Sequence, residues 1–364
     1  MKQRIYELDW LRAFAALSVI SIHTTSTYVM KNDMAYIWNQ AMRYAVPLFI
    51  ILSGFLLYYS DRKKTSIPYG SFYKRRFSKI LIPYVIWTVL YAVYKHWDVL
   101  LAAEYSTFFS ALGDHLLYGT GFVHLYFLII MVQLYLIYPL LYMWLRKHAG
   151  SFLAVTFVLT LTAEAILYFH SLGIWRVPRL TVPYVIMLPL WIFYFAMGMY
   201  LAQCRERWEP WLNGKQSRLG ILYALAFLLL LMDSKWTGTF DSSIKPTVLV
   251  YCFASYFFFY SLAIKAKAIG GKIGASVDWL SQQSFLVFLL HPFVLTAFLR
   301  KEFGLADFFG TNAGLVLLFL AVTACTIILT YVISFTPLAS YVGGVPHASR
   351  TAAKKKKAVP DALN

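Results

Sequence analysis

The chain has 364 residues, of which 60% are hydrophobic, 18% are aromatic and only 13% are charged. Because soluble domains carry about 25% charged residues, this composition excludes an ordinary soluble domain and predicts a polytopic membrane protein. The net charge of +17 does not indicate nucleic-acid binding, because the basic residues fall in short loops between apolar stretches, where they orient membrane spans. We therefore expect the lipid bilayer, and no nucleic acid, among the partners.

Ten apolar stretches of roughly membrane-spanning length predict an all-α fold with about ten transmembrane helices. They lie at roughly 9–30, 41–59, 80–97, 123–144, 151–170, 184–203, 219–233, 246–264, 278–299 and 313–341. An even number of spans places both termini on one side of the membrane. Of the basic residues in the loops and tails, 23 fall on that side and nine on the other, which predicts that both termini are cytoplasmic.

Residues 1–345 form the predicted transmembrane domain, and residues 346–364 form a basic cytoplasmic tail that we expect to be disordered and to contact anionic lipids. The first apolar run lacks a small-residue cleavage pattern, so we expect a retained helix and not a signal peptide. No internal repeat is evident, which gives no support to an inverted-repeat transporter. Cys204, Cys252 and Cys325 are far apart and odd in number, so they predict no disulfide framework and no metal site.

Arg12 and His23 lie in the first predicted helix, eleven residues apart. Steps of about 100° bring both side chains to the same side of that helix, separated by about 16 Å along its axis. An ionisable group inside a bilayer costs several kcal/mol unless it faces the interior of a helix bundle or a wet cavity. The pair therefore predicts that the first helix lines a functional site.

Five stretches occur in a fixed order along almost the whole chain. They are Leu8 to Ala13 followed by His23, Val46 to Phe55, Phe72 to Tyr84, His124 to Phe127, and Phe285 to Pro292. Together they resemble the membrane-bound acyltransferase type 3 family, whose first helix has an arginine, ten residues and a histidine. The compact ten-span form is similar to members that modify surface polysaccharide, such as those encoded with poly-N-acetylglucosamine adhesin synthesis.

This resemblance implies transfer of an acetyl or other short acyl group from cytoplasmic acyl-CoA to a sugar hydroxyl at or beyond the outer face. Two positions depart from the family pattern. The family often has Arg-x-x-Arg at the start of the third helix, but the second position here is Lys79, which cannot bind a phosphate bidentately. Many members have an acid near the position of Gln133, so no role of that acid is transferred to this chain.

His23 and Glu164 are the candidate catalytic residues. A sugar hydroxyl is a poor nucleophile at neutral pH, so acyl transfer needs a base, and we expect His23 to remove the hydroxyl proton. A covalent acyl-histidine is the less favoured variant, and a neutral histidine bonded to a carbonyl is the structural alternative. Glu164 lies deep in the fifth span, where it needs a partner or a proton. It orients His23, pairs with an arginine or stays protonated, and the sequence does not choose among these.

Arg12, Arg75, Arg76 and Lys79 are the candidate acyl-CoA-binding residues, because cations on the inner side suit the phosphates of CoA. Arg76 and Lys79 are one helical turn apart and face the same way. The alternatives are that Arg12 extends to the inner headgroups or pairs with Asp9, and that the basic cluster is only a topology signal.

Ser53, His124 and His291 are candidates for the acceptor path or a cavity. Each also has a plain structural interpretation. Ser53 with Gly54 is typical of close helix packing, and His124 opens its span at the membrane interface. His291 precedes Pro292, whose missing N–H leaves a carbonyl unbonded and predicts a kink.

The sequence therefore predicts a multi-pass plasma-membrane O-acyltransferase acting on a cell-envelope polysaccharide, with polysaccharide synthesis machinery as a further partner. Acyl-CoA is expected as a co-substrate, with no resident cofactor. No metal is expected, because His23, His124 and His291 come from different spans. The main alternative is a non-catalytic polysaccharide exporter, since transporters also line their paths with ionisable residues. A scaffold within a synthase complex is a third hypothesis.

Overall fold

The computed structural model describes residues 4–178, 180–266, 269–300, 302 and 304–344, and the regular structure within them is entirely helical. The longer helices are α1 (Tyr6–Ser26), α2 (Asp33–Ala41), α3 (Ala45–Asp61), α4 (Tyr69–Lys95), α6 (Tyr105–Tyr118), α7 (Tyr126–Lys147), α8 (Ala149–Ser171), α9 (Ile192–Gln203), α11 (Gln216–Thr237), α12 (Pro246–Ala266), α13 (Gly271–Phe298) and α15 (Asn312–Ser334). Short helices are α5 (Trp97–Leu101), α10 (Arg205–Trp208), α14 (Ala306–Phe309) and α16 (Ala339–Val342), with 3-10 turns at Tyr184–Ile186, Leu188–Leu190 and Pro210–Leu212. The prediction of an all-α polytopic fold is confirmed.

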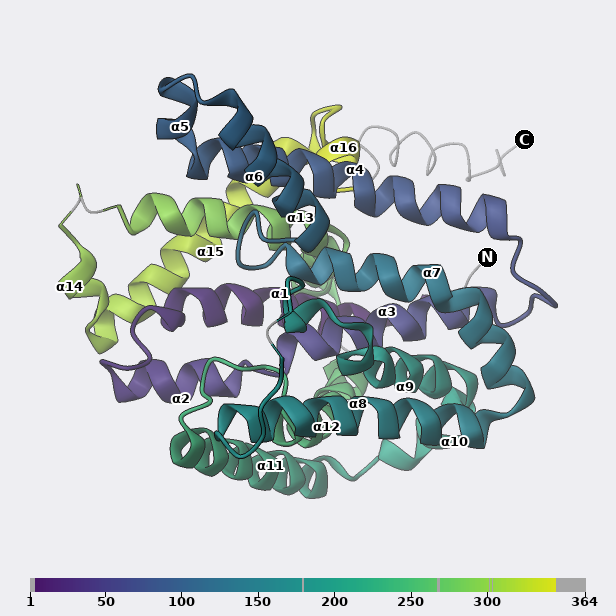
Figure 1. Cartoon of the computed structure of the whole chain (residues 1–364). Helices are drawn as coiled ribbons and strands as arrows, with labels where there is room; N and C mark the ends of the chain where they lie inside the picture. Colours follow the sequence, from purple (N-terminus) through teal and green to yellow (C-terminus); the bar gives the residue numbers. More distant parts are fainter. Residues whose placement is uncertain (1–3, 179, 267–268, 301, 303, 345–364) are drawn as a thin grey trace, which may run out of the picture.

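Helix α1 lies at the centre of the bundle and packs against α2, α3, α12, α13 and α15 (Figure 1). Its buried residues include Ala13, Ala15 and Ala16, whose small side chains let neighbouring helices approach closely. The first helix is therefore enclosed by protein on several sides, and its polar residues face the bundle.

Eight helical stretches in the described residues are long and apolar enough to cross a membrane. They coincide with the second to fifth and the seventh to tenth predicted spans. The first predicted span is the 21-residue helix α1, which carries Glu7, Asp9 and Arg12 near one end. The sixth is shorter than predicted, because α9 has only 12 residues.

Proline explains the shortened sixth span. Pro183 and Pro189 lie in the segment that precedes α9, where the chain forms two 3-10 turns instead of continuing the helix. Thr160 of α8 donates a 2.7 Å hydrogen bond to the Pro189 carbonyl and accepts one from the Phe193 N–H. The Gln133 amide donates to the Ile186 carbonyl at 2.8 Å, so the irregular backbone is bonded inside the bundle.

Helices α3 and α9 cross with their backbones in contact. A Cβ atom at Gly54 would overlap the Phe195 carbonyl, and one at Gly198 would overlap the Ile51 carbonyl. The predicted close-packing role of Gly54 is therefore observed. The helix crossing also fixes the position of the neighbouring residue Ser53 on α3.

One predicted segment begins elsewhere in the structure, and another cannot be compared with it. Helix α4 begins at Tyr69, about three turns before the predicted third span, so the basic cluster at residues 74–79 is helical. The predicted basic tail, residues 346–364, lies outside the described residues.

Candidate active site

A first cavity, which we call the Arg12 pocket, has a volume of about 290 Å³. It is bordered by α1, α3, α4, α7 and α13, and its lining includes Arg12, Ser53, Arg76, Lys79 and Tyr135. Four of the predicted site residues thus meet at one cavity although they come from three helices. On the predicted orientation, this cavity lies toward the cytoplasm.

Three cations face the Arg12 pocket. Within the described residues, Arg12 forms no ion pair, because Asp9 is instead bonded by Arg4 at 2.7 Å and by the Ser281 hydroxyl at 2.7 Å. The predicted pairing of Arg12 with Asp9 therefore does not form, and the Arg12 guanidinium is not neutralised by a direct contact. An excess of unpaired positive charge suits a phosphate-bearing ligand.

Arg75 does not join the other predicted acyl-CoA-binding residues, whereas Ser53, predicted for the acceptor path or a cavity, lines this one. Arg75 is exposed and lies outside the lining of the pocket, with its Nε bonded to the Ser71 carbonyl at 3.0 Å. Ser53 does line the pocket, but its hydroxyl donates to the Phe49 carbonyl of the preceding turn at 2.8 Å. Such a bond satisfies the hydroxyl locally.

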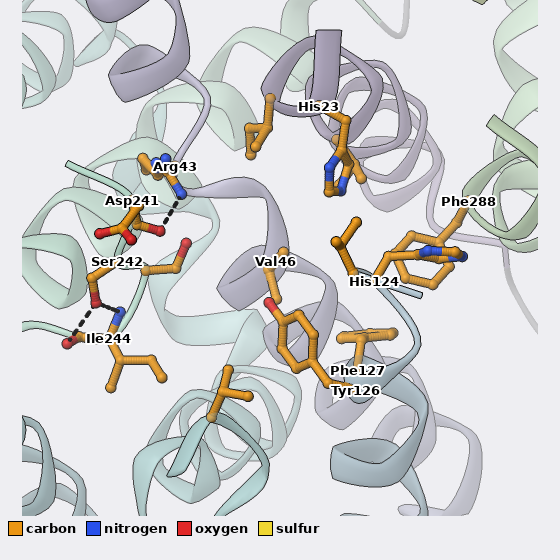
Figure 2. Close-up of a pocket in the computed structure, with 15 residues that line it drawn as sticks. His23, Arg43, Val46, His124, Tyr126, Phe127, Asp241, Ser242, Ile244 and Phe288 are labelled. Carbon is orange, nitrogen blue, oxygen red and sulfur yellow. Dashed lines mark hydrogen bonds between the residues drawn. The ribbon is translucent and has the colours of Figure 1, made fainter. Parts of the chain in front are cut away.

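A second cavity, which we call the His23 pocket, has a volume of about 380 Å³. His23 from α1 and His124 from the segment before α7 border it, and Arg43 lies on another side beside Asp241 (Figure 2). Ile22, Val46 and Tyr126 complete much of the remaining surface. Arg12 and His23, which the helical spacing placed on one side of α1, thus line two successive cavities.

The three predicted histidines lie close together, but only His23 and His124 line the His23 pocket, and His291 is buried behind them. The ring of His291 lies 5.2 Å from that of His23 and 5.7 Å from that of His124, measured between centroids. His124 and His291 are buried, whereas His23 is partly exposed to the cavity. Spans far apart in sequence therefore bring three imidazoles together.

The hydrogen bonds define what these rings offer. Nδ1 of His291 donates to the Val287 carbonyl at 3.1 Å, which leaves Nε2 as an acceptor in the neutral ring. That Nε2 and both ring nitrogens of His124 have no hydrogen-bond partner among the described residues. Buried polar atoms are normally bonded, so unpartnered nitrogens next to a cavity suit a hydroxyl-bearing ligand.

Arg43 is a site residue that the sequence does not single out. The orientation of the spans places it among the basic residues of the outer loops. It is 6% exposed, donates to the Asp241 carbonyl at 2.8 Å and to the Asn39 side chain at 2.5 Å. Its Nε has no partner among the described residues. The available signal was its position, because Arg43 lies inside the predicted span at residues 41–59.

A buried polar network holds the loop that carries Asp241. Lys245 forms an ion pair with Asp233 at 3.0 Å and donates to the Ser234 hydroxyl at 2.7 Å. Ser234 in turn donates to the Gln40 side chain at 2.8 Å. Burial lowers the pKa of Lys245, and the Asp233 carboxylate opposes this shift. Because the network joins this loop to α2 and α11, it fixes the position of Arg43.

Of the three alternatives predicted for Glu164, an orienting contact with His23 is not observed. It is buried on α8, where Oε1 accepts a 2.9 Å hydrogen bond from the Tyr194 hydroxyl, and it lines neither pocket. Its other oxygen has no hydrogen-bond partner among the described residues. Among the described residues Glu164 therefore contacts neither His23 nor an arginine in an ion pair, and a protonated carboxyl is the predicted alternative that stays open.

No group of three His, Cys, Asp or Glu side chains with metal-binding geometry occurs in the part of the chain that the structure describes. The histidine cluster is lined on one side by Phe288, whose ring centroid lies 5.0 Å from that of His124. The arrangement suits proton transfer by neutral imidazole.

Comparison with known proteins assigns the chain to a protein family. The family model described as an acyltransferase domain matches residues 5–335, nearly the whole chain. The chain therefore belongs to this acyltransferase family, and its apolar helices make it a multi-pass membrane acyltransferase. The sequence resemblance to the membrane-bound acyltransferase type 3 family is confirmed.

Two relatives, from Staphylococcus aureus strains MSSA476 and N315, are each named a probable poly-beta-1,6-N-acetyl-D-glucosamine export protein. Each is 26% identical over 320 residues, which cover 81% of this chain and 83% of the relative. No solved structure matches the chain. The name of these relatives connects them with the export of a polysaccharide.

Proposed function

We propose that the protein is a plasma-membrane O-acyltransferase that moves an acetyl or other short acyl group from cytoplasmic acyl-CoA to a hydroxyl of a cell-envelope glycan. The observation that carries this proposal is the pair of cavities on α1, one lined by Arg12 with Arg76 and Lys79, the other by His23 with His124. The first suits the phosphates of CoA, and the second suits an alcohol that must lose a proton.

In the proposed reaction, the glycan hydroxyl attacks the thioester carbonyl, so that a C–O bond forms and the C–S bond breaks. His23 accepts the hydroxyl proton and then donates it to the departing sulfur, which leaves as the CoA thiol. Negative charge develops on the carbonyl oxygen during the attack. Arg43, held on the wall of the same pocket, supplies a fixed positive charge that stabilises it. Acyl-CoA acts as co-substrate, and Glu164 and Arg75 take no part.

The test compares cells that carry the wild-type protein with cells that carry His23→Ala at equal membrane abundance. Mass spectrometry of the envelope polymer is expected to show acyl groups in the first and to lack them in the second. His148→Ala is the matched control, because His148 is exposed between α7 and α8 and is expected to leave acylation unchanged. Undiminished acylation with His23→Ala would refute the proposal.

The names of the relatives favour a second candidate, a polysaccharide exporter. That function requires no acyl-CoA and does not need a base at the position of His23. The same cells separate the two candidates. An exporter predicts that surface polymer disappears when the protein is absent, while the acyl content of the polymer is equal in wild-type and His23→Ala cells.

A further inference from the structure

Two aromatic side chains belong to the walls of both cavities. Phe127 of α7 and Phe288 of α13 line the Arg12 pocket and also the His23 pocket, and the two linings share no other described residue. Their ring centroids lie 5.3 Å apart at an interplanar angle of 61°. Both side chains are buried. We call this pair the aromatic boundary.

One further aromatic ring packs against the aromatic boundary in each of the two pockets. On the side of the His23 pocket, Phe288 packs edge-on against His124, with centroids 5.0 Å apart. On the side of the Arg12 pocket, Phe127 packs against Phe49, with centroids 6.3 Å apart. Phe49 lines only the Arg12 pocket. The direct route from the cations to the imidazoles therefore runs past Phe127 and Phe288.

The chemistry of this boundary differs from that of either pocket. An apolar, closely packed contact lets an uncharged acyl thioester enter at little cost, whereas a phosphate would lose its hydration there without a compensating partner. The same contact excludes water from the thioester until the acceptor hydroxyl arrives. The boundary thus keeps the charged part of the donor on the Arg12 side.

We propose that Phe127 and Phe288 are the specificity-determining residues for the acyl group, because an acyl chain that extends from the Arg12 pocket toward His23 must pack against both rings. This inference rests on the proposed function. A smaller residue at either position is expected to admit a longer acyl chain. Each additional buried methylene then gains about fourfold in kcat/KM.

The test uses purified protein with acetyl-CoA or butyryl-CoA as donor. The acceptor is envelope polysaccharide isolated from cells that carry only the His23→Ala variant, since that polymer is expected to be unacylated. Phe127→Ala and Phe288→Ala are each expected to raise the butyryl-to-acetyl ratio of kcat/KM by up to about 16-fold, which is fourfold for each of the two additional methylenes. Hydrolysis of acyl-CoA without acceptor is expected to increase as well. Phe288→Trp is expected to slow acetyl transfer while acetyl-CoA binding is kept.

Phe285→Ala is the matched control, because Phe285 lies on α13 and lines only the Arg12 pocket. It is expected to leave the butyryl-to-acetyl ratio unchanged. Phe127→Leu and Phe288→Leu retain more apolar surface and are expected to give smaller shifts in the same direction, which covers the case of an unfolded alanine variant.

The outcomes separate the two proposals. If the wild-type protein transfers acetyl groups but neither boundary variant changes the ratio, the aromatic boundary does not select the acyl group and only this inference fails. An equal change in Phe285→Ala leads to the same conclusion. If the wild-type protein transfers no acyl group from either thioester, the proposed function fails and this inference fails with it.

Discussion

The Arg12 pocket and the His23 pocket hold their positive charges in different ways. In the Arg12 pocket, Lys79 is exposed, Arg76 is partly exposed, and Arg12 forms no ion pair within the described residues. In the His23 pocket, Arg43 is fixed by hydrogen bonds to Asn39 and to the Asp241 carbonyl. Unpaired cations suit capture of an anionic ligand, whereas a fixed charge suits stabilisation of a short-lived one. The comparison predicts that mutations in the two pockets affect different kinetic steps.

The largest effect is expected from His23→Ala, which removes the proposed base. The rate of acyl transfer should fall by about 10²–10⁴-fold, the range of a single general base. Binding of acyl-CoA should be retained, because the phosphates are held in the other pocket. Transfer kinetics and equilibrium binding on the same preparation measure both quantities. A matching loss of acyl-CoA affinity would contradict the division between the pockets.

Arg43→Gln is expected to lower kcat about a hundredfold, because it removes a positive charge next to the developing oxyanion. Affinity for acyl-CoA should stay the same. Arg43→Lys keeps the charge and should recover part of the rate, which a purely structural role of the hydrogen bonds to Asn39 would not predict. Single-turnover measurements on both variants make this comparison.

Arg12→Ala is expected to weaken acyl-CoA binding about 10–100-fold, since a hydrogen bond to a charged group contributes about 1.5–3 kcal/mol. The rate at saturating acyl-CoA should change little. Arg75→Ala is the control, because Arg75 is exposed and lies outside the pocket. Equal losses in both variants, measured by calorimetric titration with acetyl-CoA, would argue against the Arg12 pocket as the donor site.

The smallest effect is expected from Lys79→Arg, which restores the family's Arg-x-x-Arg pattern at the start of α4. A guanidinium can bond a phosphate through two N–H groups, so binding of acetyl-CoA should tighten by about threefold. If Lys79→Arg binds acetyl-CoA more weakly than the wild type does, the ammonium group of Lys79 already suits the phosphate better than a guanidinium at this position.

Helical spacing predicts correctly which side chains share one side of a helix when the residues lie on the same helix. Arg12 and His23 were placed on one side of α1, and Arg76 and Lys79 on one side of α4, and each lines a cavity. Hydropathy predicts ten spans, and eight of them coincide with helices long and apolar enough to cross a membrane among the described residues. Both signals are local properties of the chain.

The sequence was less informative where the outcome depends on contacts between helices. The position of Arg43 inside a predicted span marks it as unusual, but its place in the pocket depends on the contacts of residues 40–43 with the loop at Phe240 and Asp241. Glu164 is a candidate catalytic carboxylate because it lies deep in an apolar span. In the structure it lies on α8 and accepts a hydrogen bond from Tyr194. The shortened α9 was missed because hydropathy does not record the effect of Pro189 on backbone bonding.

Helix α1 is continuous from Tyr6 to Ser26, so Arg12 and His23 are connected by unbroken α-helical backbone. Under the proposed function, the helix sets the distance between the residue that binds the donor and the residue that acts as base. Inserting one residue between them would lengthen the interval by about 1.5 Å and rotate one side chain by about 100° relative to the other. Loops elsewhere tolerate insertions at small entropic cost, whereas we expect an insertion in this eleven-residue interval to abolish acyl transfer.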